Sequence, residues 1–283
     1  MSDDVTTPEA VRLVGAKPDV VARCRVRGKF ELSAFDPAQT FGWDKQAAKA
    51  TLAAELAVLA ELHLKLYAEQ RSGLLVVLQS IDAGGKGGTI RTVFAGLDPS
   101  GVDVTGFGVP SEEELAHDYL WRVHAHAPRR GRIAVFDRSH YEDVLVVRVK
   151  RLVDAGRWRR RYRHIRDWER MLVDEGFGVV KLFLDVSKEE QRARFQDRID
   201  DPDERWKFRL GDLDDRALWS DYRAAFGEAL RETSTPDAPW YVVPGDRKWV
   251  RNLVVARIVR HHLERLDPHW PPPEPGVEGL LVT

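Results

Sequence analysis

The chain has a single cysteine, Cys24, among its 283 residues. One thiol excludes a disulfide within the chain and a metal cluster built from cysteines, and it is typical of a reducing cytosol. No window approaches the length of a transmembrane helix, and the acidic start MSDDVTTPEA lacks the apolar segment of a secretory signal. We therefore expect a soluble, cytoplasmic protein with no membrane partner.

An excess of charge of one sign is also lacking. The sequence has 44 Lys and Arg against 45 Asp and Glu, so its formal net charge is -1. This balance excludes a general attraction to nucleic acid or to anionic membranes, and any anion site must be local. The segment RWRRRYRHIRDWER, residues 157–170, is basic with interleaved aromatic residues, a pattern of nucleic-acid binders. Because it lies between predicted strands, we interpret it as a covering helix and expect no nucleic-acid partner.

Short apolar segments alternate with helix-forming ones along most of the chain. Five of them predict strands, at 73–81, 102–109, 132–139, 178–187 and 239–245. A long amphipathic helix is expected to begin at Asp44, with leucines on one face at positions 52, 56, 59 and 66. Ser111 with Glu114 and Ser187 with Glu190 predict two further helix starts with capping boxes. Such alternation predicts an α/β fold whose parallel sheet is covered by helices on both faces.

The predicted organisation is one α/β domain with two flanking segments. We expect residues 1–40 to form an N-terminal arm laid over the domain, because this segment has little periodic pattern. The domain covers residues 41–268, with a helical lid at about 188–230. A proline-rich, irregular tail is expected over residues 269–283.

The segment IDAGGKGGTI follows the first predicted strand and crowds four glycines around one lysine. A buried strand that turns through glycines into a helix directs backbone N–H groups and the positive end of the helix dipole at one point, which suits a phosphate. Lys86 adds a mobile charge. The predicted phosphate-binding positions are Ala83, Gly84, Gly85, Gly87, Gly88 and Thr89, the last through its hydroxyl, which could also reach magnesium. The match to the Walker A pattern is imperfect at Ser80 and Gly87, and a turn with purely structural glycines remains the alternative.

A second motif, FDRSHYEDVLVVRV, places Asp137 and Arg138 at the end of another predicted strand. Ligands of parallel sheets bind beyond the carboxyl ends of the strands, so Asp137 and the glycine loop share one crevice if their strands are neighbours. A carboxylate there can hold magnesium, and an arginine can clamp a phosphate. The alternative is that Asp137 caps a turn and Arg138 pairs with Glu142 or Asp143.

A third segment, EEQRARFQDRIDDPDERWKF, is rich in arginine and lysine, with acids between them. A solvated charged face is the usual explanation of such a run. Its place after the fourth predicted strand also suits the lid of a small-molecule kinase, which closes over phosphates and excludes water. From this segment we select Arg194, Arg198 and Lys207 as candidate phosphate ligands.

Together with SEEELAHDYLWRVH, WSDY and STPDAPWYVVPGDRKWVRNLVVARI, these motifs closely resemble polyphosphate kinase family 2 from about Phe41 to Pro268. The resemblance implies a three-layer, thymidylate-kinase-like P-loop fold, a helical lid, magnesium dependence, a basic channel for polyphosphate and a dimer or tetramer. It also implies phosphoryl transfer between inorganic polyphosphate and nucleoside mono- or diphosphates, with ADP, AMP and GDP as candidates. By position, Asp82 and Lys86 are its Walker A acid and lysine, Asp137 and Arg138 its Walker B pair, and Arg198 and Lys207 its lid contacts.

Three positions depart from the family pattern, in which a small residue, an aspartate and a lysine are expected where Ser80, Gly87 and Gly108 stand. We interpret the chain as an active or specialised enzyme, because the other charged residues of the motifs are present. Asp82 and Asp137 are assigned to Mg²⁺ and to acceptor positioning. The alternatives are an ATP-dependent kinase of a small metabolite and a non-catalytic polyphosphate- or nucleotide-binding protein.

Overall fold

The computed structural model describes residues 19–282, and a parallel sheet lies at its centre. Its strands are β1 (Leu74–Gln79), β2 (Val102–Gly106), β3 (Ile133–Asp137), β4 (Gly178–Asp185) and β5 (Trp240–Pro244). They are arranged in the order β2-β3-β1-β4-β5, and every neighbouring pair is parallel. The five predicted strands and their parallel arrangement are confirmed.

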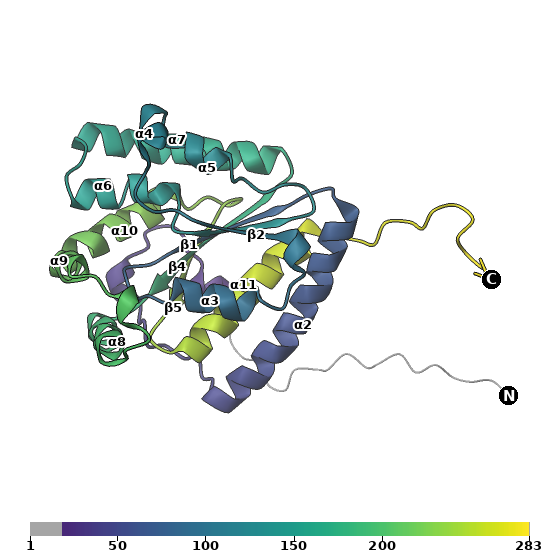
Figure 1. Cartoon of the computed structure of the whole chain (residues 1–283), viewed down its shortest axis with the longest axis horizontal. Helices are drawn as coiled ribbons and strands as arrows, with labels where there is room; N and C mark the ends of the chain where they lie inside the picture. Colours follow the sequence, from purple (N-terminus) through teal and green to yellow (C-terminus); the bar gives the residue numbers. More distant parts are fainter. Residues whose placement is uncertain (1–18, 283) are drawn as a thin grey trace.

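Helices cover both faces of this sheet, which gives three layers (Figure 1). One layer contains α1 (Val20–Cys24), α2 (Lys45–Glu69), α3 (Lys86–Val93) and α11 (Lys248–Leu266). The other contains α5 (Trp121–His124), α6 (Val146–Val149), α7 (Ala155–Asp174) and α10 (Trp219–Thr233). The remaining helices are α4 (Glu112–Ala116), α8 (Lys188–Asp200) and α9 (Gly211–Ala217), with short 3₁₀ turns η1 (Leu32–Ala34), η2 (Pro99–Gly101), η3 (His140–Asp143) and η4 (Arg205–Lys207).

The sheet is covered on both faces because its strands are apolar on both sides. Every residue of β1 and β5 is buried. Alternate residues enter opposite cores: Val76 packs in the core that contains α2 and α11, and Val77 in the core that contains α7 and α10. A strand whose sequence does not alternate between apolar and polar residues must be buried on both faces, as these strands are.

The long helix α2 has the predicted start and the predicted apolar face. The carboxylate of Asp44 accepts a hydrogen bond from the Ala47 N–H at 2.8 Å, which satisfies one of the free donors at the helix start. Leu59 and Leu66 are fully buried. Of the two predicted capping boxes, the one formed by Ser111 and Glu114 is complete. Only half of the second is present: Ser187 accepts from the Glu190 N–H, but its own N–H donates to Asp246 at 2.8 Å.

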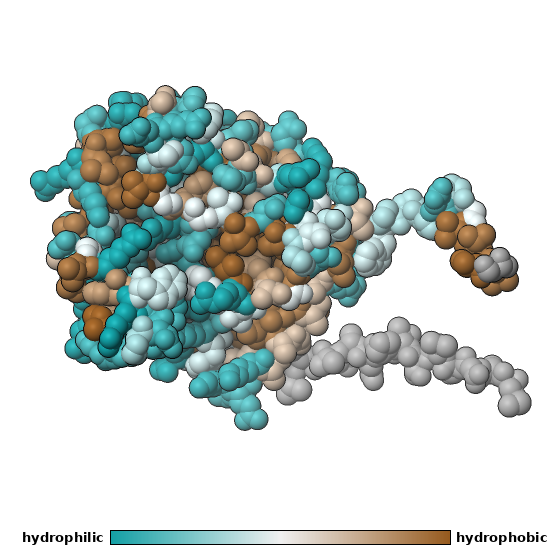
Figure 2. Space-filling model, viewed as in Figure 1, coloured by the Kyte–Doolittle hydropathy of each residue, from teal (hydrophilic) through white to brown (hydrophobic). Residues whose placement is uncertain are grey.

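The described part of the N-terminal arm lies over the domain. The Val26 N–H donates to the carbonyl of Trp240 at 2.9 Å, and Cys24 is buried, which raises the pKa of its thiol to about 12. Residues 1–18 of the predicted arm lie outside the described residues. At the other end, the chain from Asp267 to Val282 has no helix or strand, and Figure 2 shows apolar residues at the end of this tail.

Within the segment predicted to form a lid, α10 packs into the domain. Ala225 and Leu230 are fully buried there, next to α7. The residues that line a cleft come from α8, η4, α9 and the turns between them. Among residues 19–282, no helix combines the length and the apolar character needed to cross a membrane.

Candidate active site

A cleft of about 1160 Å³ opens at the carboxyl ends of β1 and β3. The two strands are neighbours, with Leu78 of β1 paired to Asp137 of β3. The glycine loop after β1 and the Asp137–Arg138 pair after β3 therefore line one crevice, as predicted. Nine Lys and Arg side chains line the cleft against six Asp and Glu, so it is locally positive in a chain of net charge -1.

The backbone of the loop requires glycine at two positions. Gly85 is the N-cap of α3 with φ of +95°, and a Cβ there would lie 1.9 Å from Nη1 of Arg251. A Cβ on Gly84 would lie 2.4 Å from the Cβ of Ser80. Gly87, in contrast, has no positive φ, and the nearest atom to its added Cβ is 3.6 Å away. The loop is therefore closely packed before Lys86 and open after it.

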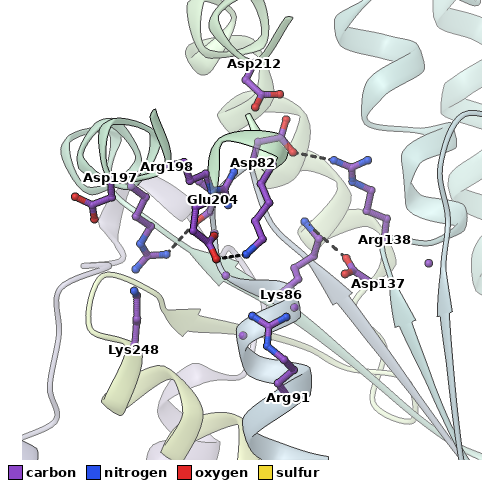
Figure 3. Close-up of a pocket in the computed structure, with 18 of the residues that line it drawn as sticks. Asp82, Lys86, Arg91, Asp137, Arg138, Asp197, Arg198, Glu204, Asp212 and Lys248 are labelled. Carbon is purple, nitrogen blue, oxygen red and sulfur yellow. Dashed lines mark hydrogen bonds and ion pairs between the residues drawn. The ribbon is translucent and has the colours of Figure 1, made fainter. Parts of the chain in front are cut away.

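Lys86 begins α3 and extends its side chain into the cleft toward Asp137 (Figure 3). Its Nζ donates to the Ser80 hydroxyl at 3.1 Å and lies 3.9 Å from Asp137. Burial lowers the pKa of Lys86, and the Asp137 carboxylate offsets part of that effect. Ser80 thus orients the lysine, although it stands where the Walker A pattern has a glycine.

Asp82 and Arg138 form an ion pair of 2.8 Å across the cleft. Arg138 has a positive φ of 64°, which is uncommon for a residue with a side chain and typical of functional sites. Asp143 pairs instead with Arg161 at 3.0 Å, so pairing of Arg138 with Asp143 is not observed. Burial lowers the pKa of Arg138, but the nearby carboxylates of Glu142 and Asp82 raise it more.

Arg194 supports the loop from α8. Its Nη1 donates to the carbonyl of Ala83 at 2.9 Å, and its Nη2 donates to the carbonyl of Gly245 at 2.6 Å. The same Nη2 donates to the Asp246 carbonyl at 3.2 Å and Nε to Glu190 at 2.9 Å, so most of its donors are occupied, although it lines the cleft as predicted. Thr89 is not brought into the cleft: it is fully buried, and its hydroxyl donates to the Gly85 carbonyl at 3.1 Å.

Arg198 and Lys207 line the opposite wall of the cleft from α8 and η4. Lys207 pairs with Glu204 within the same turn, and no ion pair of Arg198 is found in the part of the chain that the structure describes. All three candidates from the basic segment, Arg194, Arg198 and Lys207, therefore line the cleft.

Sequence reasoning missed several cations of the cleft, above all Arg251 of α11. Only 2% of Arg251 is exposed, and its guanidinium donates to Asn252 while lying against the glycine loop. Burial and the neighbouring Arg194 lower the pKa of Arg251 to about 10. The sequence feature that could have identified Arg251 is a basic segment directly after the last predicted strand. Such a segment must lie at the same edge of the sheet as the glycine loop. The other missed cations are Arg91, Arg209 and Lys248.

The carboxylates of the cleft could hold magnesium together with the phosphates of a substrate. Mg²⁺ prefers oxygen ligands, retains water and is commonly held by one or two carboxylates together with substrate phosphates. Asp82 and Asp137 are the carboxylates on the two motifs, and no cluster of three metal-binding side chains occurs within residues 19–282. These residues fit a metal that arrives with a phosphate substrate and not a preformed protein cage.

Comparisons with known proteins agree with this geometry. The profile of the family Polyphosphate kinase 2 (PPK2) matches residues 42–270. The chain is 54% identical over 262 residues to an AMP/ADP-polyphosphate phosphotransferase of Meiothermus ruber, covering 92% of this chain and 98% of that protein. It is 43% identical over 236 residues to an ADP-polyphosphate phosphotransferase of Rhodopseudomonas palustris, covering 79% and 82% of the two chains.

A solved structure shows the same fold. The crystal structure of polyphosphate kinase 2 from Arthrobacter aurescens TC1 superimposes with a TM-score of 0.90 at 42% identity, covering 93% of this chain and 95% of that one. The P-loop kinase fold expected from the resemblance is confirmed. The family profile spans the glycine loop, the Asp137–Arg138 motif and the lid segment, and this chain is a member of the polyphosphate kinase 2 family of phosphotransferases.

Proposed function

We propose that the protein transfers phosphoryl groups between inorganic polyphosphate and a nucleoside mono- or diphosphate, with AMP and ADP as acceptors. The observation that carries this proposal is the convergence of the glycine loop, Lys86 and Arg138 on one positive cleft. The names of the two relatives above supply the choice of acceptors. Homo-oligomerisation and a cytoplasmic location remain predictions.

The chemistry requires charge neutralisation more than proton transfer. A terminal phosphate of AMP or ADP is largely ionised at neutral pH, because its second pKa is about 6. No strong general base is therefore needed, and the main barrier is the repulsion between two polyanions that must align in line. Lys86, Arg138 and the amides of the loop lower this barrier because they are fixed before substrate arrives.

Asp82 and Asp137 would hold Mg²⁺ in this proposal. The metal would neutralise phosphate oxygens, as it does in other phosphoryl-transfer enzymes. In the structure both carboxylates already face cations: Asp82 pairs with Arg138, and Asp137 lies near Lys86. Each pair uses the Oδ1 atom of its carboxylate, so the second carboxylate oxygen of Asp82 and of Asp137 would be the one to hold the metal.

A coupled assay with polyphosphate and AMP, then ADP, tests the proposal. We expect ADP and ATP to form only when polyphosphate is present. Lys86→Met should reduce kcat by at least about a hundredfold, because a fixed charge that stabilises the transition state contributes roughly 3 kcal/mol or more. Lys49→Met on the exposed face of α2 is the matched control and should retain full turnover.

Two outcomes would contradict the proposal. ATP-dependent phosphorylation of a small metabolite, with no turnover of polyphosphate, would instead support a metabolite kinase. Tight binding of polyphosphate without any turnover would indicate a binding protein.

A further inference from the structure

A second cavity of about 380 Å³ lies between α4, α5 and the first half of α7. Figure 1 shows these three helices together on one side of the sheet. The segment from Gly106 to Pro110 connects this cavity to the cleft, because Gly108 lines the cleft and Pro110 lines the cavity. Arg122 lines the cavity and donates to the carbonyl of Gly108 at 3.1 Å. The cavity is therefore directly adjacent to the proposed catalytic cleft.

Cations exceed available anions on the walls of this cavity. Four arginines and two histidines line it against three acids. Each acid already has partners: Asp143 pairs with Arg161 at 3.0 Å, Glu114 accepts from the Ser111 N–H at 2.7 Å, and Asp118 accepts from the Leu120 N–H at 2.9 Å. Arg161 thus neutralises Asp143, Arg122 neutralises Glu114 at 3.6 Å, and Asp118 is the acid that has no cationic partner within the described residues.

Arg157 and Arg160 are the available cations. Both are exposed and line the cavity, and neither forms an ion pair with a carboxylate in the described part of the chain. With His164 they occupy positions i, i+3 and i+7 of α7, so the three side chains follow one face of the helix. Two arginines spaced along one helix face match a linear polyanion better than a compact anion.

The position of these arginines is costly for the helix. Asp154 caps the start of α7 by accepting from the Arg157 N–H at 2.8 Å, but the first turn itself contains no acid, and Arg157 and the arginines of the next turn place positive charge at the positive end of the helix. Positions i and i+3 are neighbours on the surface, so like charges there repel each other. The crowding extends to Arg161, whose pKa is lowered by burial and also by Arg157. A local arrangement that opposes helix stability is expected where function requires it.

We propose that Arg157 and Arg160 form a second polyanion-binding site that holds the distal part of a polyphosphate chain whose end reacts in the cleft. This inference rests on the proposed function, because it takes polyphosphate as the substrate. A chain that leaves the cleft past Gly108 reaches the cavity beside Arg122 and then meets Arg157 and Arg160 on α7. Long chains use both sites, whereas short chains use only the cleft.

The test compares a long polyphosphate with hexaphosphate as substrates of the R157Q/R160Q double variant. An exposed ion pair contributes about twofold to fivefold in affinity, so the double variant should raise KM for the long chain by about 4- to 25-fold. KM for hexaphosphate, KM for the nucleotide and kcat should stay within twofold of wild type. The effect should shrink as salt increases, because the contacts are exposed.

Arg163 supplies the matched control, since it is exposed on the same helix and does not line the cavity. R163Q should leave every KM unchanged, and R157K/R160K should restore the wild-type value by keeping both charges. An equal rise in KM for R163Q would overturn the inference, because it would show a general effect of surface charge. A rise for both chain lengths, or for neither, would also overturn it.

Two further results separate this inference from other possibilities. If the wild-type enzyme turns over no polyphosphate of any length, the proposed function fails and not the second site alone. If R157Q/R160Q loses affinity for a labelled single-stranded RNA but retains its KM for long polyphosphate, the site binds nucleic acid and the inference is wrong.

Discussion

Replacing Gly85 by alanine tests whether the loop geometry, and not merely its glycine content, builds the site. Alanine at φ of +95° strains the backbone by roughly 1–2 kcal/mol. Its Cβ would also overlap Nη1 of Arg251, at 1.9 Å. Moving that guanidinium disturbs its hydrogen bonds to Asn252, at 3.0 and 3.1 Å, which adds about 1–3 kcal/mol. The total cost of keeping the native loop is therefore about 2–5 kcal/mol.

This cost should appear as lost activity, lost stability or both. If the loop abandons its native conformation, kcat/KM should fall by about 30- to 5000-fold, since each 1.4 kcal/mol is tenfold. If the loop is retained, Tm should fall, by roughly 2–4 °C per kcal/mol for domains of 150–250 residues. The measurements are kcat/KM in the coupled assay with polyphosphate and ADP, and Tm by calorimetry.

Gly87→Ala is the matched control for Gly85→Ala. Gly87 lies in the first turn of α3, has no positive φ and leaves 3.6 Å to the nearest atom, Nη1 of Arg91. Alanine is favoured over glycine in a helix by up to about 1 kcal/mol, so Tm should stay the same or rise. Equal Tm and equal kcat/KM in the two variants would refute the reasoning, because the loop would then tolerate a side chain at its most closely packed position.

Three further predictions concern the metal, the lid and two of the three departures from the family pattern. Asp137→Asn should require more Mg²⁺ for half-maximal rate, and an unchanged Mg²⁺ titration would place the metal elsewhere. Lys207→Gln should raise KM for polyphosphate more than KM for nucleotide, because a long polyanion uses several cations at once; equal changes would instead indicate a general closing element. Both Gly87 and Gly108 leave room for a side chain, so Gly87→Asp with Gly108→Lys should fold and should change the ratio of kcat/KM for AMP to that for ADP. An unchanged ratio in the folded variant would show that neither position contacts substrate.

Short-range and periodic signals account for what the sequence predicted. The strands are uninterrupted apolar runs, Asp44 precedes a helix-forming segment, and parallel strands bring their carboxyl ends to one edge. Asp137 could therefore be placed beside Lys86 without coordinates. The register of β1 with β3 confirms that placement.

The predictions that differ from the structure concern polar groups that had more than one possible hydrogen-bond partner. Thr89 was expected to face a phosphate, but inside a helix its hydroxyl can bond the carbonyl four residues earlier, and Gly85 takes it. Ser187 was expected to be capped by Glu190, yet Asp246 accepts its N–H instead. Such choices are decided by tertiary contacts across many residues, which local patterns do not contain.

Arg251 shows what the tertiary structure adds to the chemistry. It contacts the glycine loop across more than 160 positions of sequence, and no carboxylate pairs with it within the described residues. A buried cation without an anion is costly, and its lowered pKa of about 10 still leaves it charged at neutral pH. A bound phosphate would supply the missing negative charge where water is excluded, and there the attraction is stronger than at the surface. We therefore expect Arg251 to favour binding of a substrate phosphate at the glycine loop, in a protein whose overall charge does not attract polyanions.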